Sequence, residues 1–184
     1  MTTLHLVRHG EASAGWGADA DPGLSELGHQ QAAAMAASFP DQALPIITSP
    51  LRRARETARA LEQRWNTAAL VEPGVGELPS PTDDLAERRA WLEESLSKDW
   101  EALGPRYTSW RTMVVQLLLG LREDTVVVSH YVLINAVLGA ATGSEAIIVQ
   151  PIANAAVVRV SHDHKRFELI EGLEGPATGS GTIL

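Results

Sequence analysis

Residues 4–13 read LHLVRHGEAS, an apolar run that ends abruptly in an arginine, a histidine, a glycine and a glutamate. One explanation is that a buried strand has simply reached solvent. A second is that the end of the strand binds an anion, with Arg8 and His9 as the binding side chains. The remainder of the chain distinguishes between the two.

Other apolar runs predict the fold class. LPIIT (44–48) and TVVVS (125–129) are short and continuous, which is typical of strands covered on both faces, and helical stretches separate them. Continuous strands alternating with helices predict an α/β fold with a mostly parallel sheet. NAAVVRV (154–160) and RFELI (166–170) flank a polar turn and predict an antiparallel hairpin at the sheet edge.

Capping residues predict where helices begin. Ser25 precedes one helical stretch, and Ser49 with Pro50 predicts an N-cap and first helical residue for LRRARETARALEQRW (51–65). Residues 83–105 are expected to form a helical insertion near one sheet edge. We interpret residues 1–172 as a single domain and residues 173–184 as a loose C-terminal tail.

Composition excludes several classes of function. The chain has 184 residues, no cysteine and a net charge of −8. It therefore offers no disulfide, thiolate nucleophile or cysteine-ligated metal, and its acidity disfavours nucleic-acid partners. It shows neither a signal-peptide pattern nor an apolar run of the about 18 residues that a membrane span needs. A cytoplasmic protein without a membrane partner is the expectation.

Three predicted strands end in polar residues of similar kinds. The first ends in Arg8-His9-Gly10, the second precedes an arginine-rich helix start, and the third ends in Ser129-His130-Tyr131. Ligands of parallel α/β sheets collect beyond the carboxyl ends of the strands. Two histidines and two arginines brought together there predict an anion site, because the planar guanidinium matches phosphate oxygens.

The segments LVRHGEAS, DPGLSELGHQQA, SPLRRARETA and VVVSHY, in this order, resemble the histidine phosphatase superfamily, which has the phosphoglycerate-mutase-like fold. The resemblance covers nearly the whole chain, and RHGE paired with SPLxRAxxTA is specific. It implies a three-layer α/β/α sandwich and a phosphohistidine intermediate. Such chemistry needs no metal ion and no cofactor, and the chain lacks the ligand sets that divalent cations prefer.

The resemblance also implies roles for individual residues. His9 would be the nucleophile, Arg8 and Arg53 would bind the phosphoryl group, and a protonated His130 would assist them. The proton donor of this superfamily is an acidic residue between the second arginine and the second histidine. Glu77 matches it best.

Without the resemblance, the residues alone leave two assignments open, the second phosphate-binding arginine and the proton donor. Periodicity alone does not distinguish Arg53 from Arg52 or Arg55. The weaker candidates for the proton donor are Glu72, Asp83 and Asp84.

Three further residues are candidates for the substrate pocket: Trp16, Tyr131 and Asn154. A packing role is the alternative for Trp16, and a turn or bulge is the alternative for Asn154. Residues 83–105 are expected to form one wall of this pocket.

The sequence predicts a metal-independent phosphatase that hydrolyses a phosphomonoester, either a small molecule or a phosphoprotein, through a phosphohistidine on His9. A phosphoglycerate-type mutase, a phosphohistidine-protein phosphatase and a non-catalytic phosphate-binding module are the alternatives. The chain is short, and AGWGADAD (14–21) replaces the asparagine and basic residues that mutase-like members carry after RHG. Both differences favour hydrolysis, whereas substrate and oligomeric state stay open.

Overall fold

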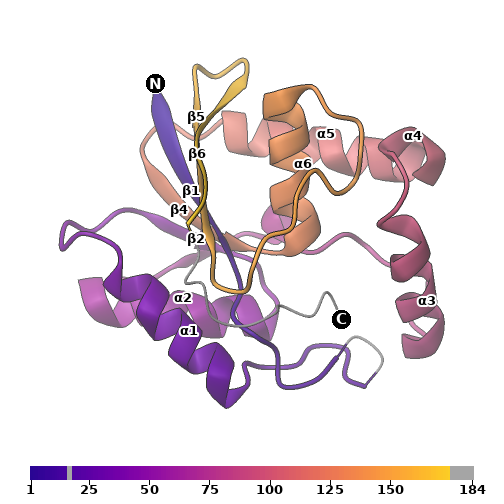
Figure 1. The fold of residues 1–184 in the computed structure, drawn as a ribbon. Coiled ribbons are helices and arrows are strands. Elements are labelled where there is room, and N and C mark those ends of the chain that lie inside the picture. The colour runs from indigo at the N-terminus through magenta and orange to yellow at the C-terminus, as the bar shows by residue number, and fades with distance from the viewer. Residues whose placement is uncertain (16–17, 175–184) are drawn as a thin grey trace.

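A six-stranded mixed sheet forms the centre of the molecule (Figure 1). The computed structural model describes residues 1–15 and 18–174. In spatial order the strands are β3 (Leu70–Val71), β2 (Ile46–Thr48), β4 (Thr125–Ser129), β1 (Thr2–Arg8), β5 (Val157–His162) and β6 (Phe167–Glu174).

The register of the parallel strands brings their carboxyl ends together. β1 and β2 each run parallel to β4, and β3 runs parallel to β2. Arg8 at the end of β1 pairs with Ser129 at the end of β4. β5 runs antiparallel to β1, and β6 runs antiparallel to β5. The predicted parallel sheet with an antiparallel hairpin at one edge is therefore confirmed.

Helices cover both faces of this sheet. They are α1 (Glu26–Ala37), α2 (Arg52–Trp65), α3 (Leu85–Ser95), α4 (Trp100–Leu103), α5 (Pro105–Leu119) and α6 (Tyr131–Thr142), with a 3₁₀ turn η1 (Pro73–Val75). α1 and α2 lie against one face, and α5 and α6 lie against the other (Figure 1). The three-layer α/β/α sandwich is confirmed.

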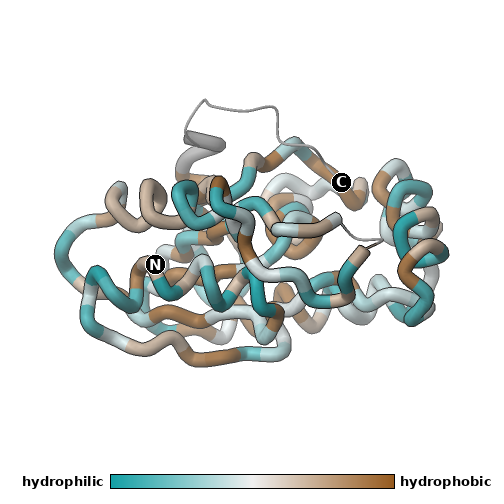
Figure 2. Tube along the Cα trace, turned by 90° about the horizontal axis from the view of Figure 1, so that it is seen from below, coloured by the Kyte–Doolittle hydropathy of each residue, from teal (hydrophilic) through white to brown (hydrophobic). Residues whose placement is uncertain are grey.

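The alternation of side chains along each strand explains the two cores. Leu4, Leu6 and Val127 belong to the cluster under α5 and α6, whereas Val7 and Val128 belong to the cluster under α1 and α2. Successive strand residues point to opposite faces, so a strand covered on both faces must be apolar throughout. In Figure 2 the peripheral helices instead alternate hydrophilic and hydrophobic segments, as burial of one side requires.

The two helix starts predicted from caps have different outcomes. The Ser25 hydroxyl accepts a hydrogen bond from the backbone N–H of Gly28 and caps α1, as predicted. The prediction of Ser49 as N-cap and Pro50 as first residue of α2 is wrong, because α2 begins at Arg52 and its N-cap is Leu51. The Ser49 hydroxyl contacts His130 and the backbone N–H of Leu51 instead.

The insertion and the chain end also need correction. Residues 83–105 are helical as predicted, but Trp100 of α4 stacks on Trp110 of α5 at 5.8 Å between ring centroids. The insertion therefore packs on the helix layer rather than at a sheet edge. β6 extends to Glu174, so the first two residues of the predicted tail belong to a strand; residues 175–184 lie outside the described part of the chain.

Glycines allow the loop after β1 to lie directly on α1. A Cβ atom on Gly28 would lie 2.1 Å from the backbone oxygen of Glu11, and one on Gly10 would lie 2.5 Å from the backbone oxygen of Gly28. Real Cβ atoms do not approach backbone oxygens so closely. The position of the loop that follows His9 thus depends on these two residues.

We predict that Gly28→Ala lowers the free energy of unfolding by about 1–3 kcal/mol, the usual range for overpacking. The loss is expected even though alanine favours an interior helical position by roughly 1 kcal/mol over glycine. Urea denaturation measures it. Gly15→Ala is the control, because a Cβ atom there meets no heavy atom within 4 Å. Equal stability of the two variants would contradict the close approach.

Candidate active site

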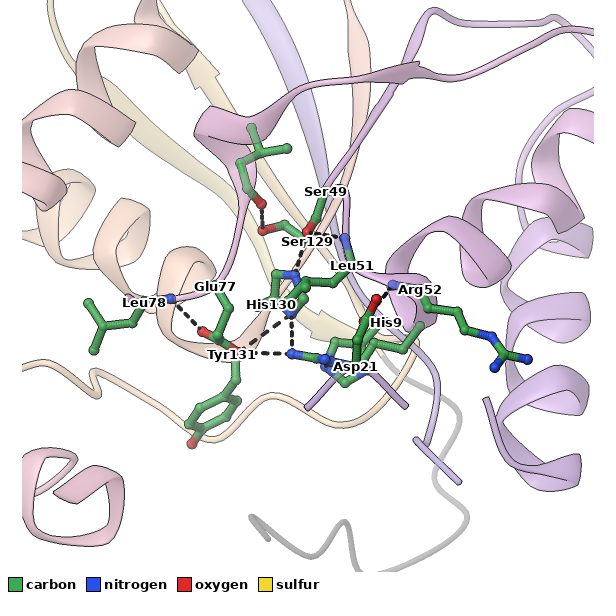
Figure 3. A network of polar contacts seen from close by, with 12 residues as sticks. His9, Asp21, Ser49, Leu51, Arg52, Glu77, Leu78, Ser129, His130 and Tyr131 are labelled. Atoms are coloured by element: carbon green, nitrogen blue, oxygen red, sulfur yellow. Dashed lines mark hydrogen bonds and ion pairs between the residues drawn. The ribbon is translucent and has the colours of Figure 1, made fainter. Parts of the chain in front are cut away.

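Polar side chains from four segments meet at the carboxyl ends of β1, β2 and β4 (Figure 3). Arg8 ends β1 and His9 follows it, Arg53 lies in the first turn of α2, and His130 precedes α6. Glu77 comes from the loop after η1. All five side chains are almost completely buried.

Hydrogen bonds define the protonation of the His9 ring. Nδ1 lies 2.7 Å from the backbone oxygen of Gly10. A carbonyl oxygen only accepts, so Nδ1 carries the proton and Nε2 carries the lone pair. Arg53 donates from Nε to this Nε2 at 3.1 Å. The nitrogen expected to be the nucleophile therefore faces a guanidinium, which is the group expected to bind a phosphoryl oxygen.

Thr57 holds Gly10, the residue whose carbonyl oxygen accepts from His9 Nδ1. Its hydroxyl accepts from the backbone N–H of Gly10 at 3.0 Å and donates to the backbone oxygen of Arg53 at 2.8 Å. The side chain is fully buried in α2. Thr57 belongs to the RETA segment (55–58), but its role was not predicted from the sequence. A threonine on the buried face of an otherwise apolar helix stripe was the available signal.

His130 lies edge-on to His9, with ring centroids 5.2 Å apart. Its Nδ1 is 3.2 Å from an Arg53 guanidinium nitrogen and 3.5 Å from Glu77 Oε2. Its Nε2 is 2.7 Å from the Ser49 hydroxyl. Figure 3 shows these contacts converging on the ring from opposite sides.

The Glu77 carboxyl reaches the same group of side chains. Oε1 accepts from the backbone N–H of Leu78 at 3.0 Å. Oε2 lies 3.8 Å from Arg53 Nη2 and has no hydrogen-bond partner among the described residues. Ser129 at the end of β4 donates to the backbone oxygen of Val75 at 2.7 Å, and this bond positions the loop that carries Glu77.

The other predicted acids and arginines lie elsewhere. Glu72 accepts from the backbone N–H of Gly74 and Asp84 caps α3, which gives both a structural role. Asp83 and Arg55 are exposed, and Arg52 forms an ion pair with Glu56 at 2.8 Å.

The structure places the pocket candidates as follows. Arg8 donates to the backbone oxygen of Ile152 and lies over the Tyr131 ring, 4.9 Å from its centroid. Tyr131 therefore contacts a phosphate-binding candidate directly. Asn154 is half-buried and precedes Ala155, whose N–H donates to the backbone oxygen of His9 at 3.2 Å. Trp16 lies outside the described residues.

Burial controls the electrostatics of the site. It lowers the pKa of His9 and of His130 well below 6.5, and the Arg53 guanidinium lowers both further. Burial also raises the pKa of Glu77, against the opposing effects of Arg53 and Arg8. In the unliganded structure the His130 ring is neutral, because Arg53 donates to its Nδ1.

The resulting charge balance favours an anionic ligand. Arg8 and Arg53 bring two guanidinium charges into a site where both imidazoles are neutral and burial raises the pKa of the Glu77 carboxyl. Buried charges without a counter-charge are costly. A phosphomonoester dianion would supply that counter-charge and match the forked donors. Among residues 1–15 and 18–174, no group of three or more metal-ligating side chains is placed to hold a metal ion.

The fold and the site define the class of the protein. Residues 4–172 match the family model of the histidine phosphatase superfamily (branch 1), so the chain belongs to this superfamily. None of the helices in the described part is long and apolar enough to cross a membrane.

Curated relatives match part of the chain. A 2,3-bisphosphoglycerate-dependent phosphoglycerate mutase of Chelativorans is 38% identical in an alignment 112 residues long, which covers 51% of this chain and 52% of the mutase. An uncharacterised protein of Mycobacterium tuberculosis is 33% identical in an alignment 118 residues long, which covers 59% of this chain and 57% of that protein. The chain thus spans about half the length of the curated relatives it matches.

Solved structures match more completely. A mycobacterial glucosyl-3-phosphoglycerate phosphatase in complex with VO3 is 25% identical, with a TM-score of 0.67 over 92% of this chain and 97% of that one. A phosphoglycerate mutase of Thermus thermophilus is 26% identical, with a TM-score of 0.59 over 92% and 97%. The phosphoserine phosphatase of Entamoeba histolytica shares the fold, at 24% identity and a TM-score of 0.71 over 93% and 96%.

We predict that Thr57→Val lowers the free energy of unfolding by about 1–3 kcal/mol, because it leaves the buried N–H of Gly10 without an acceptor. Thr57→Ser keeps the hydroxyl and is expected to lose much less. Urea denaturation of both variants measures the difference. A serine variant as unstable as the valine variant would contradict the importance of the hydroxyl.

Proposed function

We propose that this chain is a phosphatase that hydrolyses a phosphomonoester through a phosphohistidine on His9. The observation that carries the proposal is the His9 ring, whose Nδ1–H is bonded to Gly10 while its Nε2 lone pair faces the Arg53 guanidinium. A neutral imidazole held in this way is an oriented nucleophile beside a phosphate-binding group.

The first step is an in-line attack. His9 Nε2 forms a bond to phosphorus while the ester P–O bond breaks, and the leaving oxygen takes the proton of Glu77. Arg8 and Arg53 neutralise the equatorial oxygens where negative charge is concentrated. Burial raises the pKa of Glu77, which favours the protonated carboxyl that this task needs.

The second step regenerates the enzyme. Water attacks the phosphorus, the P–N bond breaks, and Glu77 takes the proton from the water as inorganic phosphate forms. His9 returns to its neutral form with the lone pair on Nε2. Glu77 therefore acts as acid in one step and as base in the next.

The substrate is proposed to be a small or extended phosphomonoester. Nearly complete burial of His9, Arg53 and His130 favours a phosphoryl group on a slender carrier over one on a folded protein surface. Two structural relatives are described as phosphatases, of glucosyl-3-phosphoglycerate and of phosphoserine. The acidic chain supports neither a nucleic-acid nor an anionic-membrane partner, and we infer a cytoplasmic enzyme.

A phosphoglycerate-type mutase is the second candidate, because a mutase is the relative with 38% identity. A mutase would form the same phosphohistidine but return the phosphoryl group to a substrate hydroxyl. The two functions differ in the fate of that group, which isotope-labelled water reveals.

We predict a phosphate adduct on His9 during turnover. The experiment is mass spectrometry after an alkaline quench, with an aryl phosphate and a panel of phosphorylated hydroxy acids as substrates. The control is His9→Ala, in which adduct and product release should both be lost. Oxygen from labelled water in the released phosphate supports hydrolysis, whereas transfer to a second hydroxy acid supports the mutase. Turnover that survives His9→Ala would overturn the mechanism, and phosphate binding without any adduct would indicate a binding module.

We also predict a bell-shaped pH dependence of kcat/KM. His9 attacks only when neutral, and its pKa lies well below 6.5, so the acidic limb lies below pH 6.5. Glu77 donates only when protonated, and burial raises its pKa above 4.5, so activity falls as pH rises through that raised value.

Glu77→Gln tests the alkaline limb. This variant should lose it, together with roughly 10²–10⁴-fold in kcat on an alkyl phosphate. The loss should be much smaller on a nitrophenyl phosphate, because that leaving group needs no proton. An alkaline limb that is unchanged in the variant would exclude Glu77 as the proton donor.

A further inference from the structure

The neighbours of His130 define which of its ring nitrogens carries the proton. Arg53 Nη2 lies 3.2 Å from His130 Nδ1, and a guanidinium can only donate. Nδ1 therefore carries a lone pair, and the ring proton is on Nε2. That proton points to the Ser49 hydroxyl, 2.7 Å away (Figure 3).

Ser49 connects this ring to the helix that carries Arg53. Its hydroxyl oxygen also accepts from the backbone N–H of Leu51 at 3.2 Å, next to the first residue of α2. Ser49 and His130 are both fully buried, so water does not replace either bond. The two bonds fix the Ser49 rotamer and with it the direction of its lone pairs.

We propose that Ser49 is a positioning residue that holds the His130 ring as its Nε2–H tautomer, with the Nδ1 lone pair facing Arg53 and Glu77. It acts through His130 and does not touch the phosphoryl group. Its kinetic consequence rests on the proposed phosphatase function, whereas the tautomer itself is a property of the unliganded protein.

The tautomer determines where His130 can gain a proton. If the phosphomonoester arrives as a monoanion, its P–O–H proton can pass to Nδ1, which leaves an imidazolium beside a dianion. Ser49 keeps the Nε2–H bond throughout, so the ring does not need to turn. A ring with the opposite tautomer would present an N–H to the Arg53 donor, and its nearest acceptor would be Glu77 Oε2 at 3.5 Å.

Other charged or titratable groups also act on His130, and each of them affects its titration. They come from β1, α2, the loop after η1 and α3, and are Arg8, His9, Arg53, Glu77 and Arg88. Because Ser49 is uncharged, its removal changes none of these charges. An altered tautomer in a Ser49 variant is therefore attributable to the lost hydrogen bond.

The test is long-range ¹⁵N–¹H correlation spectroscopy of the histidine rings in the unliganded protein. The wild type should show His130 as a single Nε2–H tautomer with a slowly exchanging ring proton. Ser49→Ala removes the acceptor, and Ser49→Cys replaces it with a weak one of nearly the same shape. Both should give a mixture of tautomers or a fast-exchanging proton. The cysteine variant also provides the measurement if the alanine variant does not fold.

Ser95→Ala is the matched control. Ser95 is also buried, but its hydroxyl has no hydrogen-bond partner in the described part of the chain. This variant should keep the wild-type His130 signals. In turnover, the Ser49 variants should lose roughly tenfold to a hundredfold in kcat/KM, as expected for one buried hydrogen bond, with a displaced pH profile.

Two results would overturn the proposal. One is a wild-type His130 that is an imidazolium or an Nδ1–H tautomer. The other is a folded Ser49 variant with the wild-type tautomer, proton exchange and pH profile. If no phosphomonoester is hydrolysed at all, the phosphatase function fails, but the spectra of the unliganded protein still decide the role of Ser49.

Discussion

The Arg53 guanidinium is the group on which the site depends. It donates to His9 Nε2 and to His130 Nδ1, and it lies within 3.8 Å of Glu77. Since a guanidinium cannot accept, one side chain determines that both facing ring nitrogens carry lone pairs. Its position follows from the fold, because Ala54, Ala58 and Leu61 pack the same helix against the sheet.

The fold could be predicted because a continuous apolar run is compatible with few structural environments. A continuous run such as residues 125–129 is stable only between two covering layers, which indicates a parallel strand with helices on both faces. The start of α2 was mispredicted for a definite reason. Ser49 and Pro50 match a helix start locally, but the serine hydroxyl is engaged by His130, a residue far away in the sequence.

The site was predictable to the extent that it lies at strand ends. The strand pattern predicted that Arg8, His9 and His130 lie at one edge of the sheet. The superfamily resemblance then identified Arg53 and Glu77 as candidates. The partners of buried side chains in distant segments were not predictable: the helix pattern could indicate a polar role for Thr57, but not that its hydroxyl bonds to Gly10. The neutral His130 of the unliganded protein was not predictable from the sequence, because it depends on burial and on a 3.2 Å contact.

The charges of the site explain binding of a phosphoryl group, but they do not select the molecule that carries it. Holding two guanidinium groups in the interior, beside a carboxyl whose pKa burial raises, is costly without an anion, and a phosphoryl dianion would offset that cost whatever carries it. Under the proposed function, the buried core would recognise the phosphoryl group alone. This agrees with the similarity of the chain both to a glucosyl-3-phosphoglycerate phosphatase and to a phosphoglycerate mutase. Discrimination between substrates must then come from residues around the core. Tyr131 is such a residue, because Arg8 lies over its ring, 4.9 Å from the centroid.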